Sequence, residues 1–284
     1  MRPRAIKELA KLGNPAFFKE IAVGLELIIA NARRLYSSAT SLAQSKHFHG
    51  AHVLEALSKE EAAKYLILLD AIRCPRSPSG QLVKQLDRFA NHLAKGLYVE
   101  AAWMRPATLG ELQRYLDAYR ETLYLDGPND VDWIFRNQIE RRREETLYVD
   151  LVEYDDGTLS WVDPKLYYES TLDDYTPRED GVLLIAGLLH DSGVSTSDAL
   201  AVIAEVWRPM AMQSAMKRQE IQHLNHRTLD CLRSKGLLRE PTASDYEMII
   251  DRWQFPLYTL DLRPIKVSVE SLREKQSLWN PGYY

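Results

Sequence analysis

Residues 51–72 read AHVLEALSKEEAAKYLILLDAI. One set of positions in this run recurs at steps of three and four, the period of a single face of an α-helix. Its members are Ala51, Leu54, Ser58, Ala62, Tyr65, Leu69 and Ile72. Several of them are small, and small residues let helices approach closely. We therefore predict a helix over 51–72 whose core face packs tightly against its neighbours.

Helical periodicity continues on both sides of this run. A preceding helix is predicted over 17–44 and ends at the polar turn 45–50. A following helix is predicted over 81–104, with leucines or phenylalanine at positions 82, 86, 89, 93 and 97. Together these runs predict a helical hairpin, roughly Ala39 to Tyr98, that sets Glu61 and Lys64 opposite His92 and Lys95.

The rest of the chain is also mainly helical in pattern. Helices are predicted over 109–125 and 131–145, and two short strands over 147–162 are joined at Asp155-Asp-Gly157, a good hairpin signal. A second set of helices begins at Gly181, and the helix that ends at Gly236 has the texture of a winged-helix module. We predict a mainly α fold: a helical domain with a small β-hairpin over 1–165, an acidic linker over 166–180, and a helical, alternatively winged-helix-like, module over 181–284.

Composition and charge narrow the function classes. The chain has 284 residues and two cysteines, too few for a disulfide framework, and its apolar runs are far shorter than the ~20 residues that span a bilayer. We therefore expect a cytoplasmic protein with no membrane partner. Residues 1–105 carry 16 Lys and Arg against 9 Asp and Glu, whereas residues 106–180 carry 8 against 19. A basic N-terminal module favours a polyanion such as RNA as partner, unless the two parts simply complement each other within one fold.

Ionisable residues share a flank of the central helix with leucines. Leu57, Glu61, Lys64 and Leu68 follow one another at steps of four, three and four. Charges bracketed by leucines are expected to be half-buried, where pKa values can shift. The alternative is a simple salt bridge within the helix, for which Glu60 and Lys64 have favourable i,i+4 spacing.

The next predicted helix carries a basic group. Arg88, His92 and Lys95 lie within about 60° of one another on a helix, beside its apolar face. A histidine flanked by cations has its protonated form disfavoured, which suits a general base near neutral pH. The cations would bind phosphate and stabilise the transition state of RNA cleavage. The alternative is a solvated basic face.

These runs, Ala39-Thr-Ser-Leu-Ala-Gln-Ser45, Gly50 to Tyr65 and Phe89-Ala-Asn-His-Leu-Ala-Lys95, resemble the AbiV family of abortive-infection proteins. The family shows a Glu-Glu-x-x-Lys helix, a His-x-x-Lys helix and a later Tyr-Val-Asp segment before Trp and Pro. The later segment reads Leu147-Tyr-Val-Asp150 through Trp161-Val-Asp-Pro164 here, so the resemblance covers about residues 17–165. The family is similar to HEPN proteins, helical modules that often dimerise and cleave RNA with an Arg-x4–6-His motif. Only three residues separate Arg88 from His92 in this chain.

The resemblance implies a HEPN-like bundle and an antiphage abortive-infection effector, acting as a metal-independent ribonuclease or a translation-blocking RNA-binding toxin. His92 would be the base or acid, Lys95 and Arg88 would bind phosphate, and Glu61 and Lys64 would orient them. A homodimer and a phage-encoded activator are implied, with the acidic residues 106–180 covering the site until activation. The alternative is a non-catalytic protein- or RNA-binding module in which Glu61, Lys64, His92 and Lys95 form a structural network.

Other functional patterns are weak. His190-Asp191 imitates the metal step of phosphohydrolases, but no further histidine lies between positions 92 and 190. His223 and His226 stand i,i+3, and two histidines alone are a weak metal site. No Gly-rich phosphate loop is present. A DNA-binding winged helix at 181–260 is disfavoured because residues 182–240 carry 7 basic against 6 acidic residues. We predict no cofactor and no metal.

Overall fold

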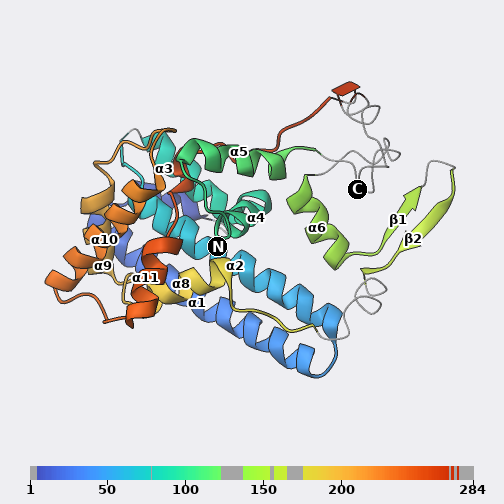
Figure 1. Cartoon of the computed structure of the whole chain (residues 1–284), viewed down its shortest axis with the longest axis horizontal. Coiled ribbons are helices and arrows are strands. Elements are labelled where there is room, and N and C mark those ends of the chain that lie inside the picture. Colours follow the sequence, from blue (N-terminus) through green and yellow to red (C-terminus); the bar gives the residue numbers. More distant parts are fainter. Residues whose placement is uncertain are drawn as a thin grey trace.

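The computed structural model describes residues 5–77, 79–122, 137–153, 157–164, 175–268, 270, 271 and 274. The fold is mainly α, as predicted (Figure 1). The elements are η1 (Ala5–Lys11), α1 (Asn14–Gln44), α2 (Phe48–Arg73), α3 (Ser79–Asp87), η2 (Arg88–Ala90), α4 (His92–Ala101), α5 (Leu109–Arg120), α6 (Gln138–Leu147), β1 (Asp150–Glu153), β2 (Leu159–Val162), α8 (Gly181–Asp191), α9 (Ser197–Trp207), α10 (Arg218–Ser234), α11 (Ala243–Arg252) and η4 (Leu257–Thr259).

The two longest helices, α1 and α2, form a hairpin whose residues 17–32 and 62–72 contribute to the hydrophobic core, whereas its turn lies at the end away from α9–α11 (Figure 1). The chain reverses at Lys46, whose φ of 60° lies in the left-handed region. The predicted core face of α2 is buried: Ser58, Ala62 and Tyr65 have no exposed surface. The Ser58 hydroxyl donates a 2.8 Å hydrogen bond to the carbonyl of Ala32, so this polar residue ties α2 to α1 instead of weakening the core.

The predicted single helix over 81–104 is wrong, because the chain breaks between α3 and α4. Residues Arg88–Ala90 form a 3-10 turn, and Asn91 becomes the N-cap of α4. The Asn91 side chain accepts a 2.9 Å hydrogen bond from the backbone N–H of Ala94, which favours a new helix start over continuation. The break changes the direction in which Arg88 points relative to His92.

The predicted β-hairpin is confirmed. Strands β1 and β2 pair antiparallel with Leu151 opposite Trp161, and Gly157 in the turn has a φ of 79°. The helix before the hairpin, α6, begins at Gln138, and α5 ends at Arg120 rather than at 125. Residues 123–136 and Asp155-Asp156, on which parts of these predictions fall, lie outside the described residues. In Figure 1 α6 and the hairpin lie at the end of the molecule opposite α9, α10 and α11.

Helices α8 to α11 share one hydrophobic core with the N-terminal helices. Trp207 and Trp253 pack with ring centroids 5.7 Å apart, and the guanidinium of Arg73 from α2 lies over both rings. The winged-helix alternative is wrong for the described residues: beyond Gly236 the chain is irregular over 237–242 and enters α11, without the expected strand. Helix α10 is continuous from Arg218 to Ser234. The division at 1–165 and 181–284 stays a prediction.

The described end of the predicted linker, 175–180, runs beside α1 and α2. The Pro177 carbonyl accepts a hydrogen bond from the Tyr36 hydroxyl, and Asp180 lies 3.3 Å from the ammonium of Lys59. Residues 165–174 lie outside the described part of the chain. Among the described helices, none has both the length and the apolar character needed to cross a membrane.

Candidate functional site

A polar cluster joins three helices around one carboxylate. Glu60 on α2 accepts from Lys95 Nζ at 2.6 Å and contacts His92 Nδ1 at 3.0 Å, both through Oε2. Its other oxygen, Oε1, lies 3.3 Å from Nε of Arg143 on α6. Lys95 Nζ is also 3.2 Å from His92 Nδ1. We call Glu60, His92, Lys95 and Arg143 the Glu60 cluster.

The start of α4 explains how the cluster forms. His92 is the first residue of α4, directly after the N-cap Asn91, and Lys95 lies one turn later on the same face. Both therefore approach α2 at the level of Glu60. The prediction that His92 and Lys95 lie together and face the central helix is confirmed in this respect, although the carboxylate they meet is Glu60 and not Glu61.

Burial differs sharply within the cluster. The Lys95 side chain is only 7% exposed and its ammonium is engaged, whereas the His92 side chain is 50% exposed. Among the described residues, Nε2 of His92 has no hydrogen-bond partner, so one ring nitrogen is held and the other is available to a ligand. This is the arrangement that a general base requires, because the held nitrogen orients the ring.

The electrostatics keep Glu60 ionised. Burial alone would raise the pKa of Glu60, but the hydrogen bonds and charges of Lys95 and His92 outweigh burial and hold that pKa below its ordinary value. The Glu60 carboxylate and the Lys95 ammonium both lie within hydrogen-bond distance of Nδ1 of His92, so the protein holds the ring through this nitrogen.

The predicted pair Glu61 and Lys64 lies next to the cluster but does not join it. Lys64 Nζ donates to Glu61 Oε2 at 2.5 Å, and the ammonium lies 5.3 Å from the ring centroid of Phe89. The i,i+4 pairing of Glu60 with Lys64 is likewise not formed, because Lys64 uses the i,i+3 carboxylate. Both side chains are half-buried, as the bracketing leucines predicted. Neither contacts His92 or Lys95, so the expectation that Glu61 and Lys64 orient these residues directly is not met.

Arg88 is held by other groups. Its guanidinium donates to the carbonyls of Leu257 and Leu260 and to the side-chain carbonyl of Gln85. These contacts fasten the segment around η4 to the helical body. The prediction that Arg88 shares a face with His92 and Lys95 is therefore wrong, and the break at Asn91 is the physical reason.

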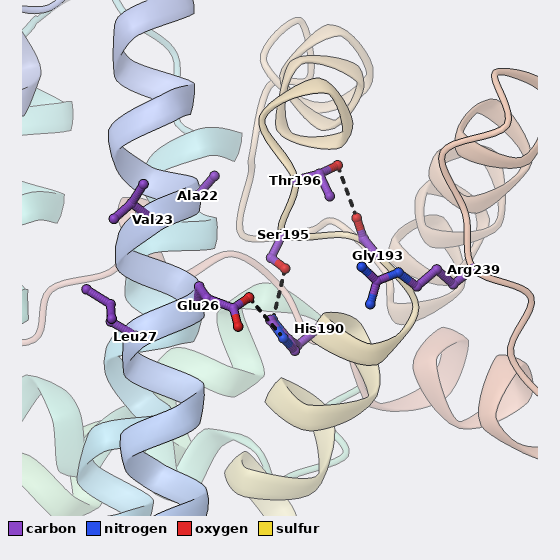
Figure 2. A pocket seen from close by; sticks show the side chains of 9 residues that line it. All are labelled: Ala22, Val23, Glu26, Leu27, His190, Gly193, Ser195, Thr196 and Arg239. Atoms are coloured by element: carbon purple, nitrogen blue, oxygen red, sulfur yellow. Dashed lines mark hydrogen bonds and ion pairs between the residues drawn. The ribbon is translucent and has the colours of Figure 1, made fainter.

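The His190 motif forms a local pairing and no metal site. His190 Nδ1 lies 2.9 Å from the Ser195 hydroxyl and Nε2 lies 3.4 Å from the Glu26 carboxylate, beside a hollow of 340 Å³ (Figure 2). Asp191 instead pairs with Arg33 at 2.6 Å. Over the described ranges, no group of three or more His, Cys, Asp or Glu could hold a metal ion. Both ring nitrogens of His190 therefore face protein groups, which distinguishes this histidine from His92.

The comparisons with known proteins decide the family. A family model described as AbiV, of the HEPN group, matches residues 20–175, more than half of the chain. The chain belongs to the AbiV family. Every residue of the Glu60 cluster lies inside the matched segment of this AbiV chain, and the family points to a role in abortive-infection defence. No curated protein and no solved structure matches the chain.

Two cluster members of this AbiV chain were missed by sequence reasoning. Glu60 is adjacent to the predicted Glu61, but a turn of ~100° per residue places it nearly opposite the core stripe, where a solvent-facing residue is expected. Arg143 lies in the run Arg141-Arg-Arg143, which carries no periodic signal that selects one arginine. The sequence did contain one signal for Glu60: the pair Glu60-Glu61 precedes the His92-x-x-Lys95 pair by two helices.

Proposed function

We propose that this AbiV-family protein is an abortive-infection effector that cleaves RNA without a metal ion, in the cytoplasm where RNA is translated. The observation that carries the proposal is His92, whose Nδ1 is held by Glu60 while Nε2 is left without a partner among the described residues. Lys95 adds a fixed positive charge 3.2 Å from the same ring. A basic segment at residues 1–105 provides the polyanion attraction that RNA needs.

The reaction follows from this geometry. Nε2 of His92 takes the proton from a ribose 2′-hydroxyl, and the 2′ oxygen attacks the adjacent phosphorus. The bond from phosphorus to the 5′ oxygen breaks, and the leaving oxygen takes a proton from water. The products are a 2′,3′-cyclic phosphate and a 5′-hydroxyl. Glu60 stabilises the imidazolium that forms, as a carboxylate does for a catalytic histidine.

The test uses the purified full chain on total RNA, with chelator present. We expect cleavage that leaves 2′,3′-cyclic phosphate ends, and a loss of about 100-fold or more in His92→Ala, because a positioned base contributes that much. His223→Ala is the matched control, since His223 is an exposed histidine outside the cluster. Circular dichroism checks that each variant is folded. Undiminished cleavage by His92→Ala would overturn the catalytic role.

A second function is supported by the burial of Lys95. Its ammonium is engaged with Glu60 and nearly inaccessible, as in a network that fixes helix packing. In this case the protein binds RNA or a protein and blocks translation without cutting. A wild type that stops translation in vitro while the RNA stays intact favours this function over the ribonuclease.

The proposed function also implies two binding partners. We expect a homodimer, because HEPN modules often dimerise, and a phage-encoded activator that exposes the site. Analytical ultracentrifugation tests the dimer. RNA integrity in infected and uninfected cells tests the activator.

A further inference from the structure

Arg143 reaches the site from a helix distant in sequence. It lies on α6, which begins 43 residues beyond Lys95 at Gln138, and its Nε is 3.3 Å from Glu60 Oε1. His92 and Lys95 occupy the other carboxylate oxygen. Glu60 therefore holds three basic side chains at once, and the local charge of the cluster is positive whether or not His92 is protonated.

Lys95, Arg88 and Arg143 differ in their remaining hydrogen-bonding capacity. Lys95 is 7% exposed and already donates to Glu60, and Arg88 is bound to carbonyls of the segment around η4. The Arg143 side chain is 28% exposed, and neither Nη group has a partner among the described residues. A planar guanidinium with two unused Nη groups matches the geometry of a phosphate in a bidentate contact.

We propose that Arg143 binds the RNA phosphate beside His92, the role that the family resemblance implied for Arg88. This inference rests on the proposed function, since it names the group that holds the substrate at the same site. Glu60 then has two tasks: Oε2 orients His92, and Oε1 attracts the guanidinium of Arg143 as an ion pair, which keeps the phosphate-binding group near the base.

The position of Arg143 depends on a close contact between α6 and α4. A Cβ atom at Gly96 would lie 2.2 Å from Cγ2 of Ile139, so only glycine allows α6 to approach this closely. Ile139 is β-branched and its Cγ2 moves with the main chain, so a larger residue at 96 must displace α6 itself. Arg142 pairs with Glu100, one turn beyond Gly96 on α4, at 2.9 Å, which holds α6 against the same helix.

An RNA-binding measurement with RNA that cannot be cleaved tests the role of Arg143 separately from ribonuclease activity. We would measure fluorescence anisotropy of the full-length protein with a single-stranded RNA whose riboses are 2′-O-methylated, so that no 2′-hydroxyl can react. Arg143→Ala should weaken binding about tenfold, because a charge-assisted contact is lost. The slope of log affinity against log salt should fall by ~0.7 for one phosphate contact on a single strand. Arg227→Ala is the matched control: Arg227 is an exposed arginine on α10, outside α6 and the Glu60 cluster, and its loss should leave the affinity and the slope unchanged.

The outcomes are distinct. Wild type that binds but never cleaves removes the ribonuclease and leaves the role of Arg143 standing. Arg143→Ala with wild-type affinity and salt slope overturns the role of Arg143, whatever the cleavage result. A wild type that does not bind the RNA overturns it as well. Arg143→Lys should restore part of the affinity but not the bidentate contact.

A second variant tests positioning without removing a charge. Gly96→Ala should displace α6 and weaken RNA binding in the same direction as Arg143→Ala. Gly80→Ala is the matched control, because a Cβ there meets nothing within 4 Å. Thermal unfolding confirms that both variants are folded. Unchanged RNA affinity in a folded Gly96→Ala protein would show that the close contact of α6 does not position Arg143.

Discussion

Two polar clusters lie on the same pair of helices, α2 and α4, and differ in how completely they are satisfied. The Asp70 cluster consists of Asp70 and Arg73 on α2, Gln85 on α3 and Tyr98 on α4, all of them buried. Asp70 Oδ2 accepts from the Tyr98 hydroxyl at 2.6 Å and from the backbone N–H of Leu257 at 2.7 Å, and Oδ1 accepts from Arg73. The Glu60 cluster lies more than two helical turns away along α2 and contains a half-exposed histidine.

This difference distinguishes polar residues that stabilise the fold from polar residues that can bind a ligand. In the Asp70 cluster, Gln85 donates to the Ile67 carbonyl and to the Tyr98 hydroxyl, and Arg73 donates to the Gln254 carbonyl, so its members are bound to the protein itself. Burial and the charge of Asp70 raise the pKa of Tyr98 well above its ordinary value, which keeps the hydroxyl a donor. In the Glu60 cluster, His92 and Arg143 keep donor or acceptor groups for a ligand. Closed networks fix the fold, and open ones can bind.

The largest expected loss of unfolding free energy comes from a substitution in the Asp70 cluster. Asp70→Asn removes the charge that faces the buried Arg73, and breaking a buried ion pair costs about 3–5 kcal/mol of unfolding free energy. His92→Ala at the open cluster should cost within about 0.5 kcal/mol, as is usual for partly exposed residues. Urea denaturation followed by circular dichroism measures both. Equal losses in the two variants would contradict the distinction.

Arg88 gives an effect of intermediate size. Arg88→Ala leaves the carbonyls of Leu257 and Leu260 without their donor, which should cost about 1–3 kcal/mol of unfolding free energy. RNA cleavage per folded molecule should stay at the wild-type level, because Arg88 is not in the Glu60 cluster. The measurement is cleavage rate normalised to the folded fraction at a temperature well below the melting transition. Loss of cleavage in folded Arg88→Ala protein would show that Arg88 does take part in the reaction.

Arg88 and Arg143 show how far the site could be predicted from the sequence. The helical hairpin, the β-hairpin and the pairing of His92 with Lys95 depend on spacing within short segments, which periodicity and turn residues reveal. Arg88 was misplaced because the break at Asn91 depends on one side-chain cap that competes with helix continuation. Arg143 could not be found because its approach depends on α6 packing against Gly96, a contact between distant segments.

Glu60 was missed for a related reason. Periodicity identifies the face of α2 that packs on α1, and it assigns the opposite face to solvent. In the structure α4 and α6 pack near that second face, where they supply His92, Lys95 and Arg143. A central helix packed on both sides gives only its more apolar face a clear sequence signal.

The smallest expected effect is the pH dependence of the open cluster. The pKa of Glu60 is below its ordinary value in the folded state because Lys95 and His92 outweigh burial, so its contribution to stability is present above the unfolded carboxylate pKa of about 4.3 and is lost as pH falls through the folded value. Glu60→Gln removes this charge and should cost about 1 kcal/mol at pH 7. The difference in unfolding free energy from wild type should shrink as the pH falls below about 4.3, because the wild-type carboxylate then takes up a proton on unfolding. Urea denaturation at pH 7, 5, 4 and 3.5 measures it, and Glu61→Gln, which lies on the same helix and pairs with Lys64 instead, is the matched control. A Glu60→Gln deficit that persists unchanged at pH 3.5 would mean that packing, and not the charge of Glu60, holds His92 and Lys95 in place, and the cluster would then be structural like that of Asp70.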